Sequence, residues 1–223
     1  MAETSADGRP SRRHQRRLQH LDLSRAQLLD AAEEGFGRKG YHATTLKEVA
    51  DLAEFSVGSV YSFFDNKGDL FSQVLMRRGV EIVGAMQDAV AGGGSCVDQL
   101  HRLVDAEVGF FRGHPHFARL FRRSSDLVLP RPGKDVDSPE DDTFHTAMAL
   151  HADVFRRGQA AGQFRSGDPA VLGSLLSGLI SAYQALDPEI LDPEIMDDGA
   201  REPDAAASSL ATLHRIVEDA FRA

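Results

Sequence analysis

Apolar residues recur at intervals of three and four positions along most of this chain, and almost no segment alternates with a period of two. The first spacing places apolar side chains on one face of an α-helix, whereas a half-buried strand requires alternation. Clusters of glycine and proline interrupt the pattern and separate one segment from the next. The sequence therefore predicts an all-α protein.

The first two predicted helices are separated by a glycine cluster between positions 35 and 40. The first helix begins at Ser24, a favourable N-cap, and ends at that cluster. The second starts at Thr45, whose distance along the chain to Glu48 is that of a capping box, and ends near Ala53. The second helix is therefore short.

Two further helices are predicted before a run of three glycines. Ser56 is the expected cap of a short third helix that extends through Phe64. Asp65 is the expected cap of a long fourth helix from Lys67 to about Ala91, where Gly92–Gly94 interrupt it. Two short helices thus follow a longer one and precede another.

The rest of the chain carries apolar stripes at helical spacing on both sides of a proline-containing loop, Leu129–Asp142. Asp168 and Pro169 form a typical N-cap and first-position pair. The predicted helices are Cys96–Arg112, His114–Arg123, a segment from Phe144 that Gly158 and Gly162 close, Pro169–Ala185 and Ala205–Phe221.

Composition is that of a globular protein, with 42% hydrophobic and 26% charged residues. No apolar run approaches the roughly 18 residues that span a bilayer, and Met1–Pro10 lacks the apolar core of an export signal. The lone Cys96 can form no internal disulfide, which fits a reducing compartment. We therefore expect a cytoplasmic protein.

The net charge of −9 is unevenly distributed. Arg9–Arg25 is rich in arginine, whereas Leu186–Asp204 is strongly acidic and contains the repeated pentapeptide LDPEI. We interpret the acidic stretch as a solvated connector, with a metal or partner site as the alternative. The arginines form either a solvated tail or a contact to the minor groove or backbone of DNA.

Two short helices joined by a tight turn and packed on a first helix are typical of a helix-turn-helix unit. The third helix would be the recognition helix, with Ser56, Val57, Gly58 and Ser59 in the turn that enters the major groove. Gly58 would allow the backbone to approach DNA closely. The pattern therefore predicts DNA binding despite the acidic net charge.

The side chains of this unit suit particular contacts. Ser59 and Ser62 can bond phosphates or base edges, Tyr61 can donate its hydroxyl to a phosphate, and Val57 can contact a thymine methyl. Thr45 and Lys67 each stand at a helix N-terminus, where anions are favoured. We expect the latter two to contact phosphates on either side. A three-helix unit that binds nothing, with the aromatic residues as core, is the alternative.

Within Ser24–Leu75 the chain closely resembles the N-terminal domain of TetR-family transcriptional regulators. The resemblance is carried by LLDAAEEGFGRKGYHATTLKEVADLAEFSVGSVYSFFDNKGDLF, with its GY turn, paired threonines, G-x-x-Y and N-K-x-x-L. It implies a homodimer that represses promoters by binding a palindromic operator. The matching positions that face DNA in that family are Thr45, Ser56, Val57, Gly58, Ser59, Tyr61, Ser62, Phe63 and Lys67.

Three residues depart from the family pattern. Glu54 stands where a turn glycine is common, Phe63 where His or Tyr is common, and Val57 where a polar residue is frequent. These departures leave the operator sequence open. The resemblance implies three parts: a flexible basic arm at 1–23, a DNA-binding domain at 24–70 and a helical effector-binding and dimerisation domain at 71–223.

The resemblance also implies a small, largely apolar effector that releases the protein from DNA. Plain core is the alternative for most of the aromatic residues in question. The candidate effector-binding residues are Phe110, Phe111, His114, Phe117, Phe121, Phe144, Met148, His151, Phe155 and Tyr183, with Phe164 and His145 as further candidates. Dimerisation is expected through Pro169–Ala185 and Ala205–Phe221, whose apolar surface exceeds what one monomer buries.

Other kinds of site are not expected. Gly35, Gly37 and Gly40 satisfy G-x-G-x-x-G but follow a helix instead of a strand, so no dinucleotide site is predicted. The histidines at 114, 116, 145 and 151 lack the spacing of a metal site, and Cys96 lacks a redox partner. No cofactor, metal or catalytic residue is expected. The same dimer without an effector, an activator, and an all-helical enzyme or transport protein remain alternatives.

Overall fold

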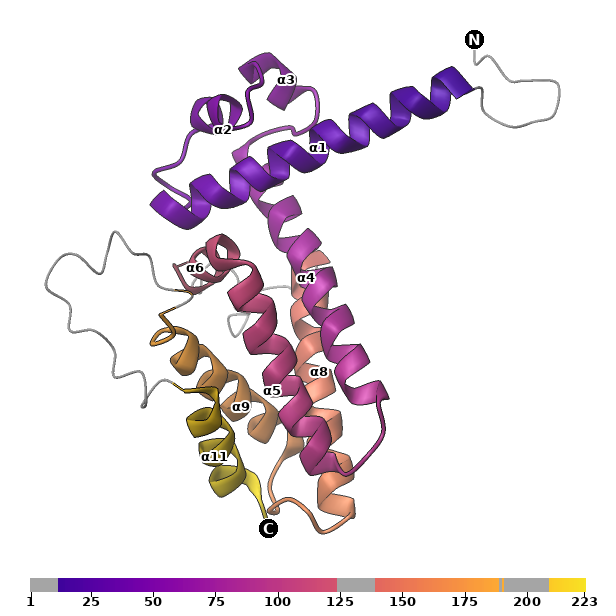
Figure 1. The fold of residues 1–223 in the computed structure, drawn as a ribbon, viewed down its shortest axis with the longest axis vertical. Coiled ribbons are helices and arrows are strands. Elements are labelled where there is room, and N and C mark those ends of the chain that lie inside the picture. Colours follow the sequence, from indigo (N-terminus) through magenta and orange to yellow (C-terminus); the bar gives the residue numbers. More distant parts are fainter. Residues whose placement is uncertain (1–11, 124–138, 189, 191–208) are drawn as a thin grey trace, which may run out of the picture. The chain divides into compact units, whose positions relative to one another are not determined.

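The computed structural model describes residues 12–123, 139–188, 190 and 209–223. All regular elements in these ranges are helices, apart from one isolated bridge between Phe164 and Arg222. The all-α prediction is therefore confirmed. The chain forms two compact units, Met1–Val74 and Leu75–Ala223 (Figure 1). None of the described helices is long and apolar enough to cross a membrane.

The first unit contains α1 (Arg12–Lys39), α2 (Leu46–Leu52), α3 (Val57–Tyr61) and the start of α4 (Lys67–Ala91). Its two short helices join α1 through buried apolar side chains, as the helix-turn-helix prediction requires. The largest of these are Leu28, Phe36, Phe64 and Leu70, all at most 1% exposed. Burial of this kind stabilises the unit because apolar surface is removed from water.

The start of α1 differs from the prediction. The helix begins at Arg12, and Ser24 lies inside it as a buried residue, so 12–23 are not a flexible arm. Arginine, glutamine and leucine dominate this segment and favour helix, and no glycine or proline interrupts it. A serine acts as an N-cap only where the preceding residues are not already helical. Residues 1–11, which complete the predicted arm, lie outside the described residues.

The end of α1 shows which glycine terminates a helix. Gly35 and Gly37 are helical, and a Cβ at Gly35 would stand 3.1 Å from Cγ2 of Thr44. Gly40 follows the last helical residue with a φ of 84°, and its N–H bonds the Phe36 carbonyl at 2.8 Å. Gly40 therefore caps the helix, while Gly35 allows the α1–α2 loop to pack closely.

The turn between α2 and α3 contains the only described non-glycine residue with a positive φ, Glu54 at 59°. An L-residue pays about 1–2 kcal/mol in this region, although glycine loses more entropy on folding. We expect Glu54→Gly to raise the free energy of unfolding by about 0.5 kcal/mol in urea titrations. Glu34→Gly, inside α1, should lower it by about 1 kcal/mol. Equal destabilisation by both changes would contradict the strain at Glu54.

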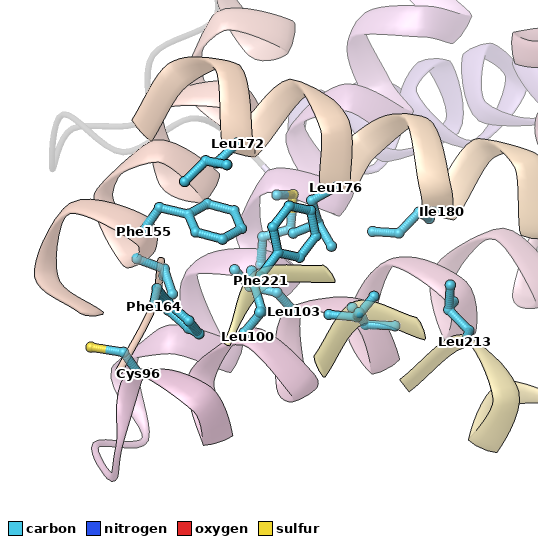
Figure 2. Packing of buried hydrophobic residues seen from close by; sticks show 14 of the residues in the cluster. Cys96, Leu100, Leu103, Phe155, Phe164, Leu172, Leu176, Ile180, Leu213 and Phe221 are labelled. Carbon is cyan, nitrogen blue, oxygen red and sulfur yellow. The ribbon is translucent and has the colours of Figure 1, made fainter. Parts of the chain in front are cut away.

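The second unit contains the rest of α4, with α5 (Cys96–Gly113), α6 (Pro115–Arg123), α8 (Pro139–Ala160), α9 (Pro169–Gln184) and α11 (Leu210–Phe221). Helices α4, α5, α8, α9 and α11 all contribute side chains to one hydrophobic core. Figure 2 shows the rings of Phe155, Phe164 and Phe221 close to one another in this core. Phe155 lies 5.3 Å from Phe164 and 4.9 Å from Phe221, measured between ring centroids.

Several helix ends in this unit differ from the predicted ones. Helix α8 begins at Pro139, inside the predicted loop, and continues through Gly158. Helix α11 begins at Leu210 with Ser209 as its N-cap, later than predicted, and 205–208 lie outside the described residues. The Asp168 cap with Pro169 is confirmed, since the Asp168 carboxylate accepts the Ala170 N–H at 2.8 Å.

In the first LDPEI copy Leu186 is exposed, but two residues are buried, contrary to the predicted solvated connector. Asp187 is fully buried, and its Oδ2 accepts from Nε of Arg112 at 2.8 Å. Ile190 is 1% exposed, and its carbonyl accepts from Arg119 at 3.2 Å. Acidic composition could not reveal this because the partners are arginines far along the chain. The second copy lies outside the described residues.

Candidate nucleic-acid interface and ligand cavity

The capping box at the start of α2 forms as predicted. Thr45 Oγ1 accepts the Glu48 N–H at 3.2 Å, and Oε2 of Glu48 accepts the Thr45 N–H at 2.8 Å. Lys39 Nζ lies 2.6 Å from Oε1 of the same carboxylate. The hydrogen bond from Lys39, followed by those from Thr45, lowers the pKa of Glu48 to about 2. The stabilisation of α2 is therefore present above the ordinary pKa and is lost as the pH falls through about 2.

Helix α3 presents a small, largely uncharged surface. Its cap is Ser56, whose Oγ accepts the Ser59 N–H at 3.0 Å. Val57, Gly58 and Tyr61 are exposed, with Tyr61 57% accessible, whereas Val60 is completely buried. Because one side of this single turn is fixed in the core, the other side is rigid and available to a partner.

The remaining predicted contacts lie at the end of α3. Ser62 is exposed, but its hydroxyl donates to the Ser59 carbonyl at 2.6 Å, so it faces its own helix. Phe63 is half-buried beside Phe64, which is core as the sequence indicates. Eight of the nine predicted positions lie between Thr45, the cap of α2, and Phe63, just after α3. Their contact with DNA remains a prediction.

The ninth, Lys67, is held by the protein itself. Its ammonium donates to the carbonyl oxygens of Tyr41, His42 and Thr44 at 3.0, 3.3 and 3.1 Å. It also lies 4.6 Å from the centroid of the Tyr41 ring. This lysine therefore positions the α1–α2 loop, and a phosphate contact would require one of these bonds to be exchanged. Sequence reasoning missed this role because the acceptors are backbone atoms.

The first turns of α1 carry arginines on one face. Arg13, Arg16 and Arg17 are exposed and stand three and four residues apart, with His20 next along the same face. A basic stripe of this kind attracts the phosphate groups of a nucleic acid. Arg25, further along, lies 5.6 Å from the Phe64 ring and so belongs to the core edge.

Cap residues also fix the start of α4. Asn66, and not the predicted Asp65, supplies the acceptor: its Oδ1 takes the Asp69 N–H at 3.0 Å. The Asp69 carboxylate accepts the Asp65 N–H at 3.0 Å in return. Asp65 is thus one position too early, because its own N–H is one of the groups that needs a partner.

The second unit encloses an apolar cavity of about 80 Å³, well above the roughly 10–15 Å³ that one water occupies. Helices α4, α5, α6, α8 and α9 all contribute to its wall. Five of the residues predicted to bind an effector line it: Phe111, Phe117, Phe121, Phe144 and Met148.

The other predicted effector residues do not line this cavity. Phe155 and Phe164 belong to the core, and the Tyr183 hydroxyl accepts from Arg112 at 2.8 Å. The Phe110 ring lies 4.5 Å from that of His114, measured between centroids. His145 is exposed, and His151 is buried behind Glu107. Helical spacing could not separate these groups, because several faces of α5, α8 and α9 are apolar.

Sequence reasoning missed every lining residue that α4 and α9 supply. Its members share no aromatic signal that would have marked them, and a lining position differs from a core position only by which helix it faces. They are Leu75, Gly79, Ile82, Met86, Ser177, Ile180, Ser181 and Gln184, with Glu107, Thr143 and Ala147 from α5 and α8.

One face of α9 is apolar and exposed. Val171 and Leu175 are 55% and 56% accessible, and Ala182 is exposed further along. Gly178 lies between them with open space at its Cβ position. On α11, Ile216 is 47% accessible. Exposed apolar surface of this kind is typical of interaction faces in proteins.

Comparison with known proteins gives a consistent result. Residues 28–74 match the family model described as "Bacterial regulatory proteins, tetR family". The chain is 35% identical over 101 residues to the HTH-type transcriptional activator FasR of Mycolicibacterium smegmatis, covering 45% of each chain. It matches only about half, or less, of the length of the curated relatives.

Solved structures extend the likeness to the whole fold. A putative transcriptional regulator from Saccharomonospora viridis in complex with choline has a TM-score of 0.68 at 20% identity, covering 91% of this chain and 99% of that one. FadR from Bacillus subtilis in complex with stearoyl-CoA has a TM-score of 0.64 at 16% identity, covering 86% and 96%. Both likenesses concern the fold alone.

Proposed function

We propose that this chain is a TetR-family regulator, a homodimeric transcriptional repressor released from its operator by a small, largely apolar effector; the match of residues 28–74 to that family supports the proposal. The observation that carries this proposal is the rigid, exposed N-terminal turn of α3, with Val57, Gly58 and Tyr61 outward and Val60 in the core. A turn of this kind enters the major groove in helix-turn-helix proteins.

The two-fold arrangement is supported by the apolar face of α9 together with Ile216 of α11. Two recognition helices related by a dyad match palindromic half-sites about 34–36 Å apart, or a multiple of that distance. We propose that α9 and α11 form the dimer interface, so that light scattering gives twice the 24.3 kDa of one chain.

The cavity supports the effector part of the proposal. It is mostly apolar and lies in a unit separate from the helix-turn-helix, and two proteins of similar fold were solved with choline and with stearoyl-CoA. An effector would act by binding more tightly to the form that does not fit the operator. A regulator of this kind works on the chromosome, so we place it in the cytoplasm and on the nucleoid.

Fluorescence anisotropy tests the DNA role. The protein is titrated onto its own upstream DNA and onto a scrambled duplex, each at two salt concentrations. We expect a preference of roughly a thousandfold or more that persists when salt is raised. Equal affinity for the two duplexes would contradict recognition of the upstream operator, and no binding at low salt would favour the all-helical ligand-binding protein without a DNA role. An activator, as FasR is named, would bind equally well but raise transcription in a reporter assay.

A further inference from the structure

The cavity has a single charged group among its described lining residues, Glu107 of α5. Its side chain is almost fully buried, with the residue 6% exposed. Around it stand aromatic rings, aliphatic side chains and two methionines, with uncharged polar groups from Thr143, Ser177, Ser181 and Gln184. A carboxylate in such surroundings is costly unless it is paired.

Part of that pairing comes from His151 of α8, which is completely buried. Its Nε2 lies 2.5 Å from Oε1 of Glu107, and α9 closes over it at Gly173, where a Cβ would stand 3.0 Å from the His151 Cβ. The pair is therefore fixed from behind. No other described residue bonds the Glu107 side chain, and that side chain belongs to the cavity wall.

The other ring nitrogen of His151 fixes which way this hydrogen bond is best used. Nδ1 is buried and has no hydrogen-bond partner within the described ranges, so an N–H there would lack an acceptor. The geometry therefore suits a ring that donates from Nε2 to Glu107. An acid is then the one ionisable side chain that the described lining residues present to the cavity.

We propose that the cavity binds an elongated apolar molecule with one protonated amine, whose N–H groups donate to Glu107. The proposal rests on the proposed function, since this molecule would be the effector. Phe111 and Phe144 belong to the same wall and can add attraction for a cation, because aromatic rings are negative above their planes. An anionic headgroup finds neither lysine nor arginine among the described lining residues and is repelled by the carboxylate.

Three probes share an eight-carbon chain and differ in headgroup: n-octylamine, octan-1-ol and octanoate. They separate the contribution of the headgroup to affinity from that of the apolar chain. Each is titrated into the full-length protein without DNA at pH 7 by calorimetry. We expect a Kd for octylamine at least about tenfold below that for octanol, since charge-assisted hydrogen bonds are stronger than neutral ones. Octanoate should bind weakest. Equal affinities, tighter binding of octanoate or no binding by any probe would overturn the proposal.

A substitution tests whether Glu107 causes the preference for octylamine. Glu107→Gln keeps the size and an acceptor for His151 but removes the charge, so the advantage of octylamine should disappear while octanol binds as before. Asp88→Asn removes an exposed charge on α4 and should leave the order of the probes unchanged. Circular dichroism confirms that each variant is folded. If Glu107→Gln fails to fold, the order of the three probes on the unaltered protein decides alone.

The outcomes also distinguish this inference from the proposed function. Octylamine binding with no preference for the upstream duplex would retain the ligand class and remove the DNA role. Operator binding together with tighter binding of octanoate than of octylamine would retain the regulator and reject the amine as its ligand.

Discussion

Gly58→Glu should lower the affinity for operator DNA by at least about a hundredfold while leaving the protein folded. Gly58 is exposed in the first turn of α3, and a Cβ there would meet only Ser56 Oγ, at 3.7 Å. A glutamate fits this turn and suits a helix N-terminus better than glycine does. Against DNA, however, it places a negative charge among phosphates, and like charges at an interface cost several kcal/mol.

The measurement is anisotropy on the upstream duplex, paired with urea unfolding. Gly58→Ala separates size from charge: it should raise stability by about 0.5–1 kcal/mol and weaken DNA binding less than glutamate does. Gly109→Glu makes the same change at an exposed glycine of α5 and should leave DNA affinity unaltered. Unchanged affinity in Gly58→Glu would show that α3 does not enter the groove.

Asp187→Ala should lower the free energy of unfolding by about 2–4 kcal/mol. The carboxylate is fully buried against Arg112, which in turn donates to the Tyr183 hydroxyl at 2.8 Å. Loss of one partner from a buried pair typically costs about 3–5 kcal/mol, and the 27% exposure of the Arg112 side chain reduces this figure.

The matched control is Asp153→Ala. Asp153 also forms an ion pair at 2.8 Å, with Arg157, but both side chains are more than 40% accessible. Exposed pairs contribute little, so we expect a loss below about 1 kcal/mol. Urea or guanidinium unfolding monitored at 222 nm gives both values. Losses of equal size would mean that burial of Asp187 does not matter to stability.

Local signals in the sequence predicted local structure well. Thr45 and Glu48, Ser56 and Ser59, and Asp168 before Pro169 all form the caps that their spacing indicates. Each depends on residues within a few positions of one another, so the chemistry is readable without a fold. The predicted start of α1 was wrong for a related reason, because Ser24 is a good cap only where no helix already precedes it.

Contacts between distant segments were the part that could not be predicted. Lys67 bonds carbonyl oxygens, which every residue carries, so nothing in the sequence marks them. Asp187 meets Arg112 across 75 positions, and the acidity of its neighbours pointed the other way. Glu107 and His151 lie 44 positions apart on separate helices. The cavity likewise depends on which face of each helix turns inward.

The sole cysteine has a consequence for the chemical behaviour of the folded protein. Cys96 is buried at the start of α5, where its N–H donates to Oε1 of Gln163 at 2.8 Å. A buried thiol is shielded from bulky electrophiles until the surrounding chain separates. Alkylation of Cys96 therefore requires the contact between the start of α5 and the segment after α8 to open. The rate of alkylation measures how often this local unfolding occurs.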